Sequence, residues 1–347
     1  MAEAYVQLGL HPATAAAAEA ARLEAAGWDG VMVFDSQNLL VDPYVALTLA
    51  ATSTNRLGLG IGVTNTVTRH PAVSAAAIWS LHEASGGRAV IGMGRGNSAL
   101  FNLGAGPVRL AAFETHVRQL MAYVDGDVAE WDTAGAEADT LALDAVAKGA
   151  APRASRLKWL PPNAPPPVVE IAATGPKVMA IGARHAPRVS VSVGANLDRL
   201  GWAARQIRAA TPADREVPKL TAYVSVVADD DAAWARQQAA PEVAMHTHIL
   251  AMQKNADYPA SVDERDIINR VANVYDMNRH GNFGPQTDAL PEWFIAGNAV
   301  AGTPAECVDK LRAIAALGFD RIVYMVPIQA GLRPLQAIEQ GVLPKLA

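Results

Sequence analysis

Short apolar runs alternate with longer helical patterns along most of the chain. The first run, 5–10, precedes an Ala-rich helical stretch that opens near Pro12 and Thr14 and stops at Gly27, a typical helix end. Each apolar run with its helical partner takes about 30 residues, the spacing of βαβ units in a parallel sheet. The expected strands are 5–10, 30–34, 56–63, 89–93, 168–172, 188–193, 219–228 and 321–326.

Two stretches depart from this alternation. Residues 127–166 are rich in Ala, Asp and Pro, and 229–300 are long, largely helical and irregular. The pattern resumes after both, and Thr303-Pro304-Ala305-Glu306 has the residues of a capped helix start. Eight strand–helix units in one chain close a barrel more naturally than they extend an open sheet. We therefore expect an α/β fold, a single (β/α)8 TIM barrel over residues 1–347, with insertions at about 127–166 and 229–300.

Composition narrows the function classes. The chain is 51% hydrophobic and 18% charged, enough to form a large core, and its net charge of -5 argues against nucleic-acid binding. Cys307 is the one cysteine, which excludes an internal disulfide and a Cys-rich metal site. His246 and His248 have a spacing that could bind metal but lack an evident third ligand, so no metal is expected. The N-terminal residues do not resemble a signal peptide, and no apolar run is long enough to span a membrane, so we expect a cytoplasmic protein.

A barrel of this type places its active site at the carboxyl ends of its strands. Those positions here are small or polar and include few titratable groups, which favours chemistry supplied by a cofactor. They are Gln7, 35–37, 63–65, 94–98, 174–177, 194–196 and Pro327.

Glycines mark three of the predicted sites, and each has two interpretations. Gly58, Gly60 and Gly62 alternate in one strand, which indicates either tight packing of the barrel wall or close approach of a flat ring. Residues 174–177 open a helix after a strand and suit a phosphate, or form an ordinary helix start. The same two interpretations apply to 302–304.

Three ordered segments identify a family. Residues 57–99, with the motifs GVTN, TRHPA and SGGR, resemble the luciferase-like monooxygenase superfamily, and in particular its deazaflavin-dependent branch of methylenetetrahydromethanopterin reductases. Residues 172–194 and 302–323 are similar to later units of the same family. The resemblance implies a homodimer, a cofactor at the strand ends (coenzyme F-420 or, alternatively, FMN), and a non-proline cis peptide at Gly62-Val63.

The resemblance also implies roles for individual residues, with two departures from the family pattern. Many relatives carry a His where this chain has Ser36, and methanopterin-type reductases carry an acid where it has Gln7, so a substrate other than methanopterin is expected. Asp35 is a candidate acid or base, a hydrogen-bond acceptor for the cofactor or substrate, or else a helix cap. His70 lines the site or is structural. Arg69, Arg95 and Lys177 could neutralise a phosphate or be solvated charges. The expected catalytic residues are Asp35, Ser36, Gln37 and His70. The expected cofactor-binding residues are Gly62, Val63, Thr64, Asn65, Gly94, Arg95, Asn97, Thr174, Gly175, Pro176, Lys177 and Thr303.

Three functions remain open on the sequence. The first is hydride transfer between coenzyme F-420 and a small organic substrate. The second is FMN-dependent monooxygenation with reduced flavin and oxygen, which shares the fold. The third is a flavin-binding paralogue without catalysis, which the missing His keeps open.

Overall fold

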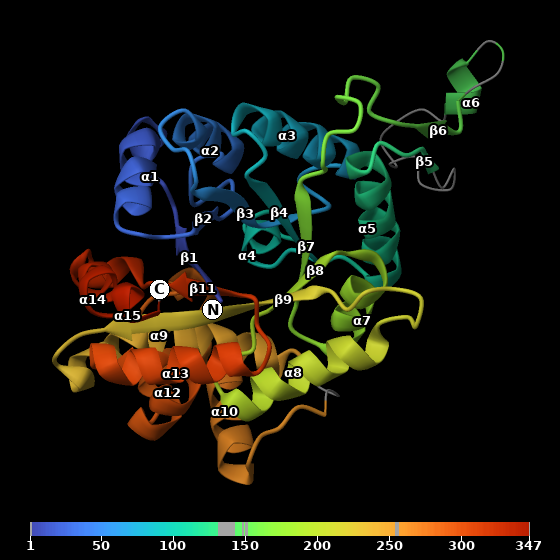
Figure 1. Cartoon of the computed structure of the whole chain (residues 1–347). Coiled ribbons are helices and arrows are strands. Elements are labelled where there is room, and N and C mark those ends of the chain that lie inside the picture. The colour runs from blue at the N-terminus through green and yellow to red at the C-terminus, as the bar shows by residue number, and fades with distance from the viewer. Residues whose placement is uncertain (1, 131–142, 148, 150–151, 254–256, 347) are drawn as a thin grey trace.

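The computed structural model describes residues 2–130, 143–147, 149, 152–253 and 257–346. Eight parallel strands form a closed barrel, because β8 pairs with β9 and β11 pairs with both β9 and β1 (Figure 1). This confirms the predicted TIM barrel. The strands are β1 (Glu3–Leu8), β2 (Gly30–Val33), β3 (Gly58–Asn65), β4 (Ala89–Gly94), β7 (Val168–Ala173), β8 (Arg188–Val191), β9 (Lys219–Ala228) and β11 (Arg321–Met325).

Helices surround the strands, and their starts follow the capping signals in the sequence. The Asp42 carboxylate accepts from two backbone N–H groups at the start of α2, and Thr303 and Glu306 form a capping box at the start of α13. The helices between strands are α1 (Ala16–Ala25), α2 (Pro43–Ala51), α3 (Pro71–Ala84), α4 (Ser98–Phe101), α5 (Leu110–Val124), α7 (Pro176–His185), α8 (Leu197–Ala210) and α13 (Pro304–Ala316), followed by α14 (Arg333–Gly341) and α15 (Leu343–Leu346). No helix among the described residues is long and apolar enough to cross a membrane.

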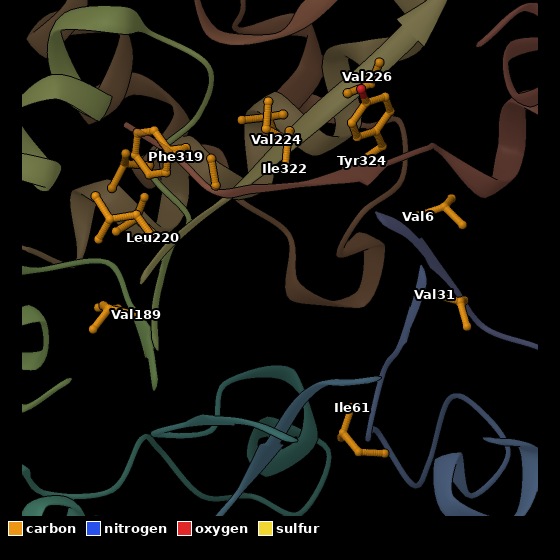
Figure 2. Close-up of a cluster of buried hydrophobic side chains, with 14 of the residues drawn as sticks. Val6, Val31, Ile61, Val189, Leu220, Val224, Val226, Phe319, Ile322 and Tyr324 are labelled. Carbon is orange, nitrogen blue, oxygen red and sulfur yellow. The ribbon is translucent and has the colours of Figure 1, made fainter. Parts of the chain in front are cut away.

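The main hydrophobic core lies between the strands and these helices. Val6, Val31 and Ile61, from three neighbouring strands, are fully buried there (Figure 2). Tyr324 on β11 packs edge-on against Trp28 with ring centroids 5.2 Å apart. Small helix residues such as Ala and Gly let the helices approach the strands closely, consistent with the Ala-rich composition.

The two irregular stretches contain short strands that the sequence pattern did not predict, and the second stretch is otherwise largely helical, as predicted. In the first, β5 (Ala129–Glu130) and β6 (Ala154–Ser155) form a short antiparallel pair near α6 (Leu143–Val146), and this part projects from the body (Figure 1). In the second, β10 (Val300–Gly302) pairs in parallel with the end of β9. The helices of the second stretch are α9 (Ala232–Ala251), α10 (Val262–Val274), α11 (Pro285–Asp288) and α12 (Glu292–Asn298).

The alternating glycines face the interior of the barrel, where they make room for large side chains. A Cβ at Gly58 would overlap the Tyr5 ring, and one at Gly60 would overlap the Met32 sulfur. These two glycines therefore serve wall packing, the first of the two interpretations. Only Gly62, the third in the series, reaches the open end of the barrel.

Candidate active site

A cavity of about 450 Å³ opens at the carboxyl ends of the barrel strands. Strand ends from around the barrel contribute to its wall, and Ile249, Met252 and Gln253 at the end of α9 close one side. Of the residues predicted to form the site, the wall includes Asp35, Ser36, Gly62, Val63, Thr64, Asn65, Gly94, Arg95, Asn97 and Thr174. It does not include Gln37, His70, Gly175, Pro176, Lys177 or Thr303.

A bulge in β3 shapes the wall at Gly62 and Val63. The pairing of β3 with β4 shifts register between Ile61 and Thr64, and the Gly62-Val63 peptide is cis, as the resemblance implied. The bulge places the Val63 side chain over two glycines of β4. A Cβ at Gly92 would lie 2.8 Å from Val63 Cγ1, and one at Gly94 would lie 3.1 Å from Cγ2. The glycines of β4 therefore accommodate Val63 at the cavity wall.

Asp35 is held by an ion pair. Its Oδ2 accepts hydrogen bonds from Thr64 Oγ1 at 2.6 Å and from Arg69 Nε at 3.0 Å. The Arg69 guanidinium also pairs with Asp42, the cap of α2, and lies 4.7 Å from the centre of the Tyr44 ring. Thr64 and Arg69 therefore fix the orientation of the Asp35 carboxyl group at the cavity wall.

Among the described residues that line the cavity, Arg95 is the one lysine or arginine. Its Nε donates to the Val108 carbonyl at 2.6 Å, and burial lowers the pKa of its guanidinium, which still leaves an arginine charged. Within the described residues, no carboxylate forms a salt bridge with Arg95. Its remaining N–H groups are therefore suited to an anionic group of a ligand.

The start of α7 contributes Thr174 to the cavity but turns its other predicted residues away. Gln253 Nε2 donates to Thr174 Oγ1 at 3.2 Å, and a Cβ at Gly175 would overlap the Gln253 side chain. Lys177 is exposed on α7. A glycine is required at position 175 because the Gln253 side chain approaches it closely. The sequence does not predict this contact, because Gln253 lies 78 residues later.

Three other predicted residues have structural contacts. Gln37 donates to the Ala99 carbonyl at 2.9 Å, behind the cavity wall. His70 is exposed and caps α3, since its Nδ1 accepts from the Ala72 backbone at 3.2 Å. The Thr303 hydroxyl is bonded to Glu306 in the capping box of α13, outside the cavity.

Comparison with known proteins identifies the family. The family model described as luciferase-like monooxygenase matches residues 3–321. This chain belongs to the luciferase-like monooxygenase family. Its relatives include the 5,10-methylenetetrahydromethanopterin reductase of Methanolobus tindarius, which is 30% identical over 315 residues, 88% of each chain. The corresponding reductase of Archaeoglobus fulgidus is 26% identical over 342 residues, 93% of each chain.

Solved structures of the family share the fold. The coenzyme F-420-dependent tetrahydromethanopterin reductase from Methanopyrus kandleri superposes with a TM-score of 0.71 at 21% identity, covering 100% of this chain and 99% of that one. A coenzyme F-420-dependent secondary alcohol dehydrogenase superposes with a TM-score of 0.67 at 14% identity, over 100% and 99%. The chain is thus an oxidoreductase-family homologue built on the luciferase-like barrel.

The floor of this luciferase-like cavity contains Gln7, a predicted strand-end position, together with polar residues that the sequence analysis did not assign to the site. Gln7 on β1, Ser190 on β8 and Tyr223 on β9 line it and are at most 5% exposed. Below them, Glu170 is fully buried and accepts from Thr221 Oγ1 at 2.8 Å, with Arg321 Nη1 at 3.8 Å. Burial, and then the negative charge of Glu170, raises the pKa of Tyr223 well above its usual value, so Tyr223 is a neutral phenol. Side chains of barrel strands point alternately inward and outward, and this alternation is the one sequence signal that could have located the floor.

The cavity wall carries buried polar atoms that a ligand could satisfy. Five buried side-chain atoms on its wall have no hydrogen-bond partner among the described residues: Gln7 Oε1, Ser36 Oγ, Asn97 Oδ1, Ser190 Oγ and Tyr223 OH. Buried polar atoms are nearly always satisfied, so a polar ligand is the natural partner for this set. Among the described residues, no cluster of three or more His, Cys, Asp or Glu side chains could hold a metal ion.

A buried histidine on α9 should make the protein less stable in acid. His246 on α9 is 2% exposed, neither ring nitrogen has a hydrogen-bond partner among the described residues, and burial lowers its pKa to about 4. Between about pH 6.5 and pH 4 the unfolded chain binds a proton that the folded chain does not. The free energy of unfolding therefore decreases as the pH is lowered across that window. The loss attributable to His246 is about 3 kcal/mol at pH 4.

Denaturant unfolding at several pH values checks this expectation. His246→Leu should flatten the decline between pH 6.5 and 4, whereas His11→Leu, at an exposed position, should leave it unchanged. A decline of the same size in His246→Leu and in the unsubstituted protein would show that His246 does not titrate in this way.

Proposed function

We propose that this protein transfers hydride between coenzyme F-420 and a small organic substrate. The observation that carries the proposal is the cavity itself, in whose wall Asp35 and Arg95 are the only charged side chains among the described residues. Asp35 is already paired with Arg69, so the wall lacks the acid–base pair or activated nucleophile that hydrolytic chemistry needs. Such a site requires a bound cofactor for its reactivity. The similarity to methanopterin reductases supports the deazaflavin as that cofactor.

The residues of this chain would hold and orient the reactants. Bound coenzyme F-420 supplies the hydride chemistry through its deazaflavin ring. Gly62 and Val63 form the wall on which the ring would rest, and Arg95 would pair with an anionic group of the coenzyme. Ile249 and Met252, from α9, would exclude water and contact the substrate. Holding both reactants side by side in one cavity supplies much of the rate in reactions of this type.

Cofactor titration tests the proposal. Purified protein is titrated with oxidised coenzyme F-420 and, separately, with FMN, and binding is followed by fluorescence and visible absorption. We expect coenzyme F-420 to bind more tightly. Preferential binding of FMN would support the monooxygenase alternative, and binding of neither would contradict a redox function.

Arg95 should control the affinity for the anionic coenzyme. Arg95→Gln removes a charged donor from the wall, and a hydrogen bond to a charged group contributes about 1.5–3 kcal/mol. The dissociation constant for coenzyme F-420 should therefore rise roughly 10- to 100-fold, with a weaker dependence on salt. Arg109→Gln, at an exposed position just before α5 and outside the cavity, is the control. Equal affinities of Arg95→Gln and the unsubstituted protein would exclude this role.

We also propose that the protein works as a homodimer, as the family resemblance implies. Light scattering on the purified protein tests the assembly, and a monomer at micromolar concentration would contradict it.

A further inference from the structure

The Gln7 carboxamide lies at the cavity floor in an orientation that its surroundings fix. Its Nε2 donates to the carbonyl oxygen of Gly62, so the nitrogen and oxygen of the amide are distinguishable. Gln7 is 5% exposed, and its Oε1 has no partner among the described residues although it is buried. A carboxamide has two N–H donors and one oxygen acceptor. One donor is used by Gly62, which leaves one N–H group and Oε1 for a ligand.

A carboxamide that presents a donor beside an acceptor pairs with any group that presents an acceptor beside a donor, such as a lactam, a primary amide or a carboxylic acid. A lactam presents N–H beside C=O, and the two groups pair with a carboxamide through two parallel hydrogen bonds. A buried amide acceptor without a partner destabilises the protein, and a lactam N–H would satisfy it. A simple carbonyl or an anion would leave Oε1 unsatisfied.

The groups beside Gln7 extend the same recognition. Tyr223 also adjoins Gly62, since a Cβ there would lie 2.8 Å from the Tyr223 hydroxyl oxygen. The hydroxyls of Tyr223 and Ser190 both lack partners among the described residues and can donate or accept. Gln7, Ser190 and Tyr223 therefore give the floor uncharged hydrogen-bonding groups.

We propose that Gln7 recognises a lactam edge, the N–H and C=O of a pyrimidinedione ring, with Tyr223 and Ser190 beside it. This assignment rests on the proposed function, because the deazaflavin ring of coenzyme F-420 carries a pyrimidinedione edge of this kind. Flavin carries it too, so the assignment of Gln7 is independent of the choice between coenzyme F-420 and FMN. Gln7 would thereby bind and orient the ring. An amide at this position, where methanopterin-type reductases carry an acid, would serve to recognise the lactam edge.

The test compares two ligands and two variants by binding, without turnover. Oxidised coenzyme F-420 and its N3-methylated derivative, which lacks the lactam N–H, are titrated into the unsubstituted protein, Gln7→Leu and Gln286→Leu. Gln286 is a matched control because it is buried and has an unpartnered Oε1 but lies on α11, outside the cavity.

We expect N3-methylation to weaken binding to the unsubstituted protein and to Gln286→Leu by about 10- to 100-fold. Gln7→Leu should bind the natural coenzyme with a comparable loss and should discriminate little between the two ligands. Equal affinity of the unsubstituted protein for both ligands would overturn the assignment, even if Gln7→Leu does not fold. Discrimination retained in Gln7→Leu would also overturn it. Tight binding of the coenzyme without discrimination leaves the proposed function standing, whereas no binding of coenzyme F-420 or FMN defeats both.

Discussion

Gly62→Val is expected to abolish measurable binding of coenzyme F-420 at micromolar protein. A Cβ at this position would lie 2.8 Å from both Met32 Cβ and the Tyr223 hydroxyl oxygen, and the first of these cannot move without its backbone. Overpacking of this kind typically costs 1–3 kcal/mol, and the displaced wall would no longer match the ring. A loss of 100-fold or more in affinity corresponds to about 2.7 kcal/mol or more.

Fluorescence titration and a thermal unfolding curve measure the two consequences of Gly62→Val separately. Gly297→Val is the control, because a Cβ there would meet no atom within 4 Å and the position lies outside the cavity. The control should bind the coenzyme normally. A folded Gly62→Val protein with unchanged affinity would mean that the ring does not rest against this part of β3.

Arg199→Met is expected to produce the largest loss of stability. The Arg199 side chain on α8 is fully buried, and its Nη2 lies 3.2 Å from Glu264 Oε1 at the start of α10. Its Nη1 donates to Asn298 Oδ1 at 2.8 Å and to the Val193 carbonyl at 3.2 Å. Arg199 thus joins the barrel to α10 and α12. Removing one partner of a buried ion pair costs about 3–5 kcal/mol, because the other partner loses its compensation.

Denaturant unfolding of Arg199→Met and Arg205→Met separates the buried contact from a general effect of losing an arginine. Arg205 lies on the same helix at an exposed position, and its replacement should change the free energy of unfolding by less than about 0.5 kcal/mol. A similar small change in Arg199→Met would show that the α8–α10 contact contributes little to stability.

The barrel was predictable because its signals are local. Each strand is a short apolar run, and helix starts such as Asp42-Pro43 and Thr303-Pro304 carry their capping residues within four positions. The residues of 62–65, 94–97 and Thr174 could be placed at the cavity because the carboxyl ends of parallel strands share one end of a barrel.

The remainder of the site depends on contacts between distant residues. Lys177 and Thr303 have the local pattern of phosphate sites, but local pattern does not determine which way a helix start faces. Gln253 reaches the cavity from the long second insertion. In the sequence, Glu170 is an isolated acid in an apolar strand, and its partners Thr221 and Arg321 are known only from the fold. β10 is three residues long, and its pairing with β9 gives no sequence signal.

The direct test of the central claim is a crystal structure of the protein with oxidised coenzyme F-420. The expected result is a deazaflavin ring inside the barrel mouth, in van der Waals contact with Gly62 and Val63. A coenzyme bound elsewhere on the protein, with the cavity at the strand ends filled by water, would contradict the claim.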